Sequence, residues 1–200
     1  MTPTGALYHH ARTRPKTVAF IRDKEIWTYE RLATEVDRLA RGLIEHGVRN
    51  GDRVALHMAN LPELVVAYHA CFRVGAIAAP LNIRFKTAEL GPLLQRLRPA
   101  LYIGQADLYS QVASIDSKTA ESYEHWDLDG DQITTLFCPM VHASGLFTMF
   151  ACIRFGVPFV LHERFDPGAI FDAIERHHCT WVIGLPFMFA ALLHQQRARA

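Results

Sequence analysis

The chain has 200 residues and a net charge of +1, with 50% hydrophobic and 20% charged residues. This composition supports a packed core and excludes a disordered chain, while the length allows one large domain or two smaller lobes. Because no basic stripe is present, we expect no nucleic acid among its partners.

The cysteines and the N-terminus bear on the compartment. The four cysteines are widely spaced, form no CxxC pair and lie in apolar surroundings; they are Cys71, Cys138, Cys152 and Cys179. Such residues are typical of buried free thiols in a reducing compartment. The first 15 residues lack the apolar core of a secretory signal. We therefore expect a cytoplasmic protein.

The first half of the chain alternates strands and helices. Its expected elements are helix 7–14, strands 18–22 and 25–28 in a hairpin, helix 28–47, strand 53–59, helix 62–75, strand 76–80, helix 87–97 and strand 100–103. Thr28 is a suitable N-cap, Pro62 fits a first helical turn, and Gly47 and Gly75 are suitable helix ends. Residues 105–126 show no clean periodicity.

The second half repeats the alternation. Its expected elements are strand 133–137, helix 145–155, strand 157–161, a helix opened by Asp166 and Pro167, strand 180–184 and helix 187–197. This pattern predicts an α/β fold with two blocks of mostly parallel strands and helices on both faces. We place the first block at residues 1–116 and the second at 117–200.

Residues 137–146, FCPMVHASGL, join a strand to a helix. Pro139 ends the strand and Gly145 permits close approach of the backbone. His142 is therefore placed at the carboxyl end of a strand, where open α/β sheets bind ligands. A buried, hydrogen-bonded structural histidine is the alternative interpretation.

The apolar run 132–153 is long enough to cross a membrane, but its strand-like start and internal proline favour a buried strand, turn and helix. We therefore expect no transmembrane segment. Behind His142, we expect Phe147, Phe150 and Ile153 to form core.

Four stretches together resemble one enzyme family. They are WTYERL at 27–32, FRVGAIAAPLNIR at 72–84, PMVHASGL at 139–146 and the helix, strand and proline segment at 164–193. Each is similar to a motif of the N-terminal lobe of the adenylate-forming superfamily, in its acyl-CoA synthetase form. The resemblance covers nearly the whole chain and is specific in combination.

The resemblance implies a two-step reaction. A carboxylic acid, such as a fatty acid, reacts with ATP and Mg²⁺ to give an acyl-adenylate, and coenzyme A then displaces AMP. It also implies an acyl pocket whose residues, by number in this chain, are His142, Ala143, Ser144, Gly145, Leu146, Gly184 and Pro186.

The chain also departs from the family pattern. The family has a glycine-rich phosphate loop ending in lysine, whose backbone amides hold phosphate, whereas residues 114–119 contain no glycine. We infer an internal deletion of several tens of residues near 116–118. The family's later adenine, magnesium, ribose and catalytic-lysine motifs are also missing. We therefore assign no catalytic, cofactor-binding or metal-binding residue, and expect ATP, Mg²⁺ and CoA not to bind productively.

Three functions compete. The first is a partial acyl-CoA synthetase that is inactive as an isolated chain. The second is a non-catalytic acyl-binding or interaction module, acting as an oligomer or with a complementing chain. The third, another nucleotide-binding fold, would need a GxGxxG turn that is missing. His9-His10 and His177-His178-Cys179 lack the further ligands that a zinc site needs.

Overall fold

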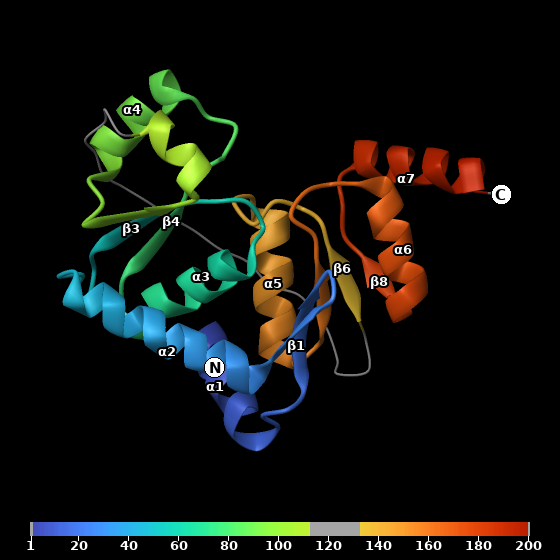
Figure 1. Cartoon of the computed structure of the whole chain (residues 1–200), viewed down its shortest axis with the longest axis horizontal. Coiled ribbons are helices and arrows are strands. Elements are labelled where there is room, and N and C mark those ends of the chain that lie inside the picture. The colour runs from blue at the N-terminus through green and yellow to red at the C-terminus, as the bar shows by residue number, and fades with distance from the viewer. Residues whose placement is uncertain (1, 113–132, 200) are drawn as a thin grey trace. The chain divides into compact units, whose positions relative to one another are not determined.

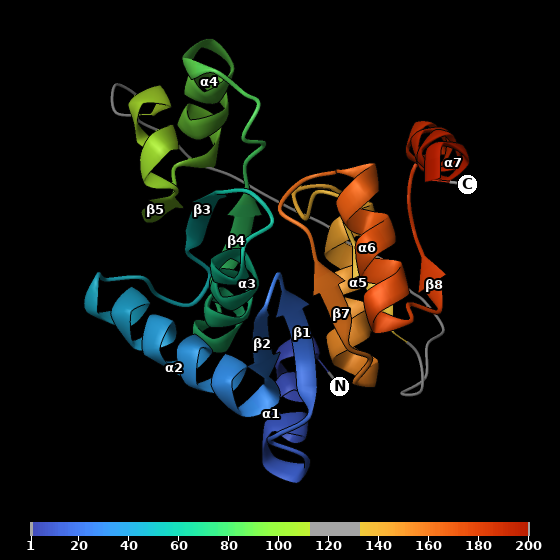
Figure 2. The same ribbon diagram turned by 45° about the vertical axis from the view of Figure 1, so that its right-hand side comes forward.

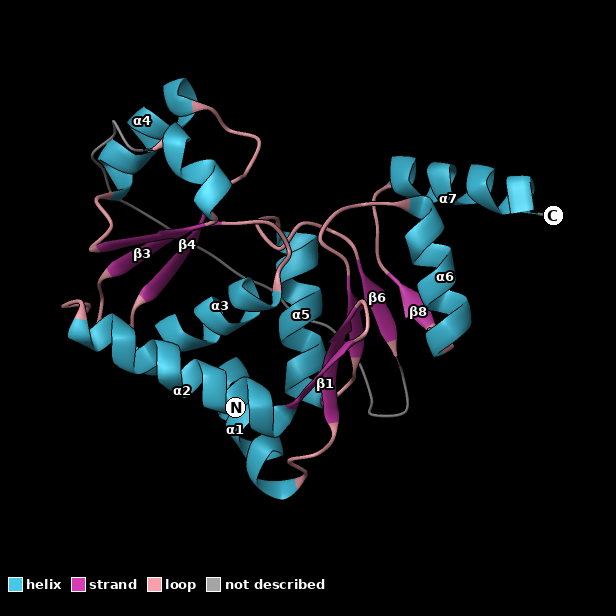
Figure 3. Cartoon of the chain, viewed as in Figure 1, coloured by secondary structure: helices cyan, strands magenta, loops and turns pink. Residues whose placement is uncertain are grey.

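The computed structural model describes residues 2–112 and 133–199, and Figure 1 follows the chain through both parts. The chain divides into two compact units. Unit 1 combines residues 1–32 with residues 124–200, and unit 2 comprises residues 33–123. The division falls inside helix α2 (Tyr29–Glu45), after Leu32. Each unit contains its own sheet, shown in magenta in Figure 3.

Unit 2 contains a parallel sheet of three strands in the order β4-β3-β5. Its elements are β3 (Arg53–His57), α3 (Pro62–Val74), β4 (Ile77–Pro80), α4 (Thr87–Leu97), β5 (Leu101–Gly104) and the 3-10 helix η1 (Ala106–Gln111), and Figure 2 labels its three strands. Four consecutive residues of the central strand β3, from Val54 to His57, are buried. A strand buried on both faces is expected where helices cover a parallel sheet.

Part of the core of unit 2 is formed between its sheet and α4. Ala55 and Ala79 of the sheet pack with Leu90, Leu94 and Leu97 of α4. The small strand side chains let the helix approach the sheet closely. Helix α3 ends as the sequence predicts, because Gly75 adopts the left-handed conformation with φ of 77°, which costs glycine little.

Unit 1 contains a five-stranded sheet in the order β2-β1-β7-β6-β8. Its elements are α1 (Pro3–Thr13), β1 (Val18–Arg22), β2 (Glu25–Thr28), β6 (Thr134–Leu136), α5 (Ala143–Phe155), β7 (Phe159–Leu161), α6 (Pro167–His177), β8 (Trp181–Val182) and α7 (Pro186–Arg199). Strands β1 and β2 form the predicted antiparallel hairpin, and β1, β7, β6 and β8 run parallel. The predicted fold class is confirmed.

Local signals predicted two helix starts in unit 1. Thr28 Oγ1 accepts a hydrogen bond from the Arg31 amide at 3.3 Å. Asp166 Oδ1 accepts from the amides of Gly168 and Ala169, at 2.8 and 3.1 Å, with Pro167 in the first turn. Both residues therefore satisfy amides that a helix leaves without partners at its start.

The sequence prediction for the core face of α5 was partly wrong. Ile153 is buried, but Phe147 and Phe150 are only half-buried, and Met149 and Cys152 are the other large side chains that α5 buries. The helix is apolar on nearly every side, so hydrophobic periodicity could not identify the buried face.

The division into units differs from the two sequential blocks expected from the sequence. The expected boundary at 116/117 lies outside the described residues. The N-terminal segment, placed by sequence in the first block, joins the second, because Phe20 of β1 pairs with Phe159 of β7. No helix within the described parts is long and apolar enough to cross a membrane.

Candidate functional site at the carboxyl ends of three strands

Strands β7, β6 and β8 end at one edge of the unit 1 sheet. Leu136 pairs with Leu161, and Thr135 pairs with Val182, all in parallel register. The segments that follow these strands therefore leave the sheet at the same edge, which is where open α/β sheets bind ligands. Two of the three segments contain all the residues of the predicted acyl pocket.

The segment after β6 is a tight turn that leads into α5. The His142 amide donates to the Pro139 carbonyl at 2.9 Å, and the Leu146 amide donates to the His142 carbonyl at 3.0 Å. His142 is the N-cap residue, but its side chain makes no capping hydrogen bond. The imidazole of His142 therefore does not cap the backbone amides at the start of α5.

Gly145 allows the first turn of α5 to lie against this segment. A Cβ atom at Gly145 would lie 2.4 Å from the carbonyl oxygen of Cys138 and 2.5 Å from that of Pro139. Neither oxygen belongs to a flexible side chain, so a larger residue would have to displace the backbone. The sequence predicted that Gly145 permits close approach of the backbone. The structure requires glycine there because any Cβ atom would meet these carbonyl oxygens.

Cys138 connects the segment after β6 to the segment after β8. Its Sγ donates to the carbonyl of Ile183 at 3.5 Å and lies 3.9 Å from Sδ of Met188. Burial raises the pKa of the Cys138 thiol, which keeps it protonated as a donor. A Cβ atom at Gly184 would lie 3.1 Å from the Phe137 ring, so these two segments are packed together.

The structure brings the predicted pocket residues to one edge but gives them different exposures. His142, Ala143 and Pro186 are exposed, Ser144, Leu146 and Gly184 are half-buried, and Gly145 is buried. The exposure of His142 excludes the buried structural histidine that the sequence left as an alternative. Its place in an acyl pocket stays a prediction.

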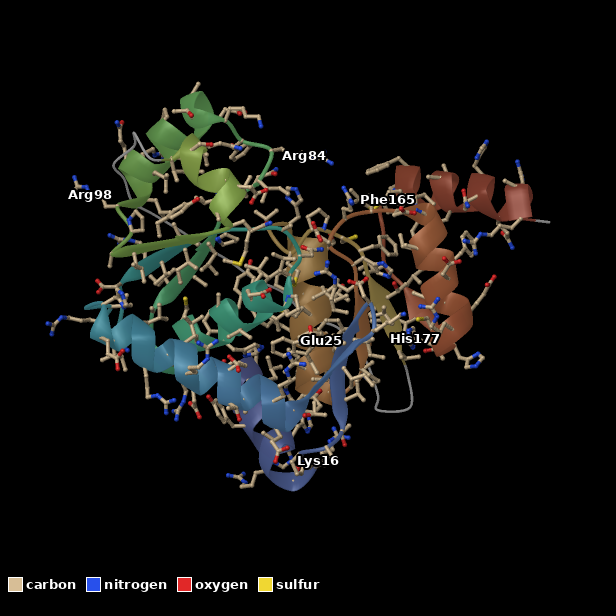
Figure 4. All side chains as sticks on the ribbon, viewed as in Figure 1. Lys16, Glu25, Arg84, Arg98, Phe165 and His177 are labelled. Atoms are coloured by element: carbon tan, nitrogen blue, oxygen red, sulfur yellow. The ribbon has the colours of Figure 1, made fainter. Side chains whose placement is uncertain are left out.

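Three aromatic rings near this edge were not assigned to the site by the sequence analysis. Phe137 and Phe165 have ring centroids 5.5 Å apart, and Phe165 lies 6.4 Å from Phe187. Phe165, labelled in Figure 4, immediately precedes the Asp166 cap of α6. An aromatic residue directly before an Asp-Pro helix start is a signal that could have drawn attention to it.

The third segment, after β7, begins with a half-buried histidine, His162. His162 Nε2 and Thr135 Oγ1 are hydrogen-bonded at 2.7 Å, and the His162 amide donates to the Leu136 carbonyl at 2.9 Å. Burial lowers the pKa of His162 to about 4, because desolvation disfavours the charged imidazolium. The neutral His162 ring is therefore held against β6 by its hydrogen bond to Thr135, and we assign it a structural role.

Metal-ligating side chains do not converge in the parts of the chain described. Within residues 2–112 and 133–199, no group of three or more His, Cys, Asp or Glu residues could hold a metal ion. The polar stretch 114–119, considered as a phosphate loop and rejected, lies outside the described residues.

Comparison with solved structures identifies the fold. The o-succinylbenzoate CoA synthetase from Bacillus subtilis, in complex with its acyl-adenylate intermediate, superposes with a TM-score of 0.81 at 22% identity, over 94% of this chain and 63% of that one. The N-terminal domain of FACL13 from Mycobacterium tuberculosis superposes with a TM-score of 0.78 at 18% identity, over 96% of this chain and 64% of that one.

Comparison with curated proteins adds information on length. The 2-succinylbenzoate--CoA ligase of Bacillus pumilus is 25% identical over 240 residues, which cover 94% of this chain and 49% of that protein. The chain thus spans about half the length of this relative. The alignment spans 240 residues but covers 94% of this 200-residue chain, which is 188 residues, so about 52 residues of the relative (240 minus 188) have no counterpart here.

The profile of the family described as "AMP-binding enzyme" matches the chain twice, at residues 7–129 and 104–200. The two matches overlap at 104–129, which is what a missing segment in that region would produce, and the predicted deletion near 116–118 lies inside the overlap. Together the matches cover nearly the whole chain. The chain therefore belongs to the AMP-binding, adenylate-forming enzyme family, as its motifs predicted.

Proposed function

We propose that this chain provides the acid-binding side of an acyl-CoA ligase and does not form an acyl-adenylate by itself. The observation that supports this most directly is the Cys138 to Ile183 hydrogen bond, which joins the segment containing His142 to the segment containing Gly184 and Pro186. Both segments follow neighbouring parallel strands at one edge of the sheet. In this proposal the acid lies against that edge.

The start of α5 suits a carboxylate. The helix has 13 residues, and its first-turn amides lie at the positive end of the helix dipole. His142 is exposed at that end and makes no capping bond with its side chain. The imidazole can therefore donate to a carboxylate oxygen while the half-buried Leu146 contacts the apolar part of the acid.

The nucleotide half of the reaction is not part of the proposal. Relatives bind ATP and magnesium ion, but this sequence contains no glycine-rich loop ending in lysine. The overlap of the two profile matches at 104–129 supports a deletion where that loop would lie. Without that loop the chain lacks the backbone amides that would hold the phosphates of ATP with Mg²⁺.

The family and the cysteines also point to a partner and a compartment. The partner is a small or fatty carboxylic acid, since the relative from Bacillus pumilus is a 2-succinylbenzoate--CoA ligase. A cytoplasmic location agrees with the cysteines, none of which forms a disulfide and three of which are fully buried. The second candidate, an interaction module that works with another chain, is supported by the exposed apolar residues of α7.

The acid-binding role is tested by direct titration. The chain is titrated with 2-succinylbenzoate, benzoate and straight-chain fatty acids, and binding is followed by NMR of the histidine ring protons. We expect one acid class to shift the His142 signals, and His142→Ala to weaken binding about tenfold or more. His46→Ala, a change at another exposed histidine, should leave binding unchanged.

The expected lack of adenylation is tested separately. The same acids are assayed for exchange of pyrophosphate into ATP in the presence of magnesium. Exchange above a blank without acid would show that the isolated chain is active, and that half of the proposal would be wrong. Acid binding that is unaffected by His142→Ala would refute the other half.

A further inference from the structure

An asparagine followed by glycine lies between α2 and β3. The sequence contains three asparagines, and Asn50 is the one that glycine follows. An asparagine in this position is prone to lose its side-chain amide, because a residue without a side chain lets its own backbone nitrogen reach the amide carbon of the residue before it. Asn50 is exposed. Its reactivity therefore depends on how the surrounding backbone holds it.

The turn that contains Asn50 is held by four hydrogen-bonding groups. The Asp52 amide donates to the Arg49 carbonyl at 3.0 Å, and the Arg49 amide donates to Asp52 Oδ2 at 2.8 Å. Gly51 is the third residue of this turn and has φ of 82°, which is typical of glycine in a type II turn. The Ile77 amide, at the start of β4, donates to the Asp52 carbonyl at 2.7 Å. The turn is therefore tied to the sheet of unit 2.

Gly75, at the end of α3, holds both groups that would react. Its carbonyl accepts a hydrogen bond from the Gly51 amide at 2.8 Å. Its Cα lies against the Asn50 side chain, because a Cβ atom at Gly75 would lie 3.0 Å from Asn50 Cγ and nearer still to Nδ2. Any larger residue at position 75 would displace the Asn50 amide, and would also have to adopt the left-handed conformation.

Deamidation of Asn50 needs both groups to be released. The Gly51 nitrogen attacks Asn50 Cγ, a new N–C bond forms, the bond from Cγ to Nδ2 breaks, and the Gly51 proton leaves with the departing ammonia. The resulting succinimide ring then takes up one water molecule from solvent and opens to aspartate or isoaspartate. In the folded turn the Gly51 proton points at the Gly75 carbonyl oxygen, and this hydrogen bond disfavours loss of the proton. The first step therefore requires the contact with Gly75 to open.

We propose that Asn50 is a site of spontaneous deamidation that the folded unit 2 keeps closed through Gly75. Chains in which this contact opens are modified, at a rate set by how often the turn opens. Isoaspartate adds one carbon atom to the main chain inside the turn, and both products place a carboxylate two residues from Asp52. The hydrogen bonds that tie the turn to β4 are then weakened, so a modified chain closes less well than before. Because Asn50 and Gly75 lie in unit 2, the proposal does not depend on the acid-binding role of His142 in unit 1.

Mass spectrometry of the peptide 46–63, released by cleavage after two glutamates, tests the proposal in the whole chain. The chain is incubated at mildly alkaline pH in native buffer and in urea, and the conversion of amide to carboxylate is followed with time. Conversion at Asn50 should be at least tenfold faster in urea. Asn60 lies in the same peptide but precedes leucine, so it should stay unmodified in both buffers. Equal rates at Asn50 in the two buffers would overturn the proposal.

Two glycine variants separate the contact with Asn50 from backbone strain. Gly47 has φ of 83°, close to that of Gly75, but a Cβ atom there would meet nothing within 4 Å. Gly75→Ala should therefore deamidate in native buffer at least fivefold faster than Gly47→Ala, and equal rates would overturn the proposal.

Circular dichroism checks that both variants fold. If Gly75→Ala does not, hydrogen exchange of the Gly51 amide in the wild-type chain decides. Folding should slow this exchange and the deamidation of Asn50 by the same factor, within about threefold, because both need the same opening. A Gly51 amide that exchanges freely while Asn50 stays intact would show that Gly75 does not control the site.

Discussion

The sheets of the two units are assembled in different ways. In unit 2, the strands β3, β4 and β5 follow one another within residues 53–104, and each is joined to the next by a helix. In unit 1, Phe20 and Ile21 pair with Phe159 and Val160, so the full sheet forms only when strands from residues 18–28 meet strands from residues 134–182. Local assembly can be predicted from strand and helix alternation, whereas the pairing of distant strands cannot.

The largest effect is expected from breaking the unit 1 sheet at Phe159. This residue is fully buried, and its ring stacks on Phe20 with centroids 5.3 Å apart. Phe159→Ala should lower the free energy of unfolding by about 3–5 kcal/mol. Hydrogen exchange should then rise in β1 and β7 while β3, β4 and β5 stay protected. Equal loss of protection in both sheets would mean that the units do not unfold separately.

Acid should also weaken unit 1 through His162. Its pKa is lowered from 6.5 to about 4 by burial, so between these pH values the unfolded chain binds more protons than the folded one. The contribution of neutral His162 to the free energy of unfolding is therefore fully present above pH 6.5. It is lost as the pH decreases towards 4, by up to about 3 kcal/mol. His162→Gln should remove this part of the pH dependence.

Tryptophan fluorescence during urea unfolding at several pH values measures this effect, because Trp27 and Trp181 lie in unit 1 and residues 33–123 contain no tryptophan. His69 provides the comparison in unit 2, where burial lowers its pKa to about 3. The acid sensitivity of unit 2, followed by hydrogen exchange of β3, should persist in His162→Gln. An unchanged fluorescence profile would contradict the assignment of the effect to His162.

A smaller effect is expected at the turn that begins α5. Gly145→Ala places a Cβ atom against the carbonyl oxygens of Cys138 and Pro139, and should cost about 1–3 kcal/mol as an overpacked site. Gly42→Ala, in α2, is the matched control, because its Cβ would meet nothing within 4 Å. That change should stabilise the chain by about 0.5–1 kcal/mol. Urea denaturation of both variants compares them, and two effects of the same sign would refute the packing argument.

The smallest effect on stability is expected at His142. Its side chain is exposed and makes no capping bond, so His142→Ala should change the free energy of unfolding by less than about 0.5 kcal/mol. Met149→Ala is the comparison on the same helix. It removes a fully buried side chain and should cost about 2–5 kcal/mol. Similar losses in the two variants would show that His142 is structural.

Much of the fold and part of the candidate site could be predicted from local sequence. Thr28, Asp166 and Gly75 mark helix ends through contacts within about four residues, so their effect does not depend on the rest of the chain. Likewise, the short spacing between the expected strands 18–22 and 25–28 predicted the hairpin that β1 and β2 form. The segment 137–146 could be located for the same reason, because its proline and glycine act on their own backbone.

The sequence by itself thus determined the α/β class, most helix ends and the family. Tertiary structure alone decided that β1 joins β7, that Cys138 reaches Ile183, and that α5 buries Met149 rather than Phe150. Strand pairing and thiol contacts join residues far apart in the chain, and no local pattern encodes them. A helix that is apolar on every side can bury any face, so its neighbours select the face that forms the core.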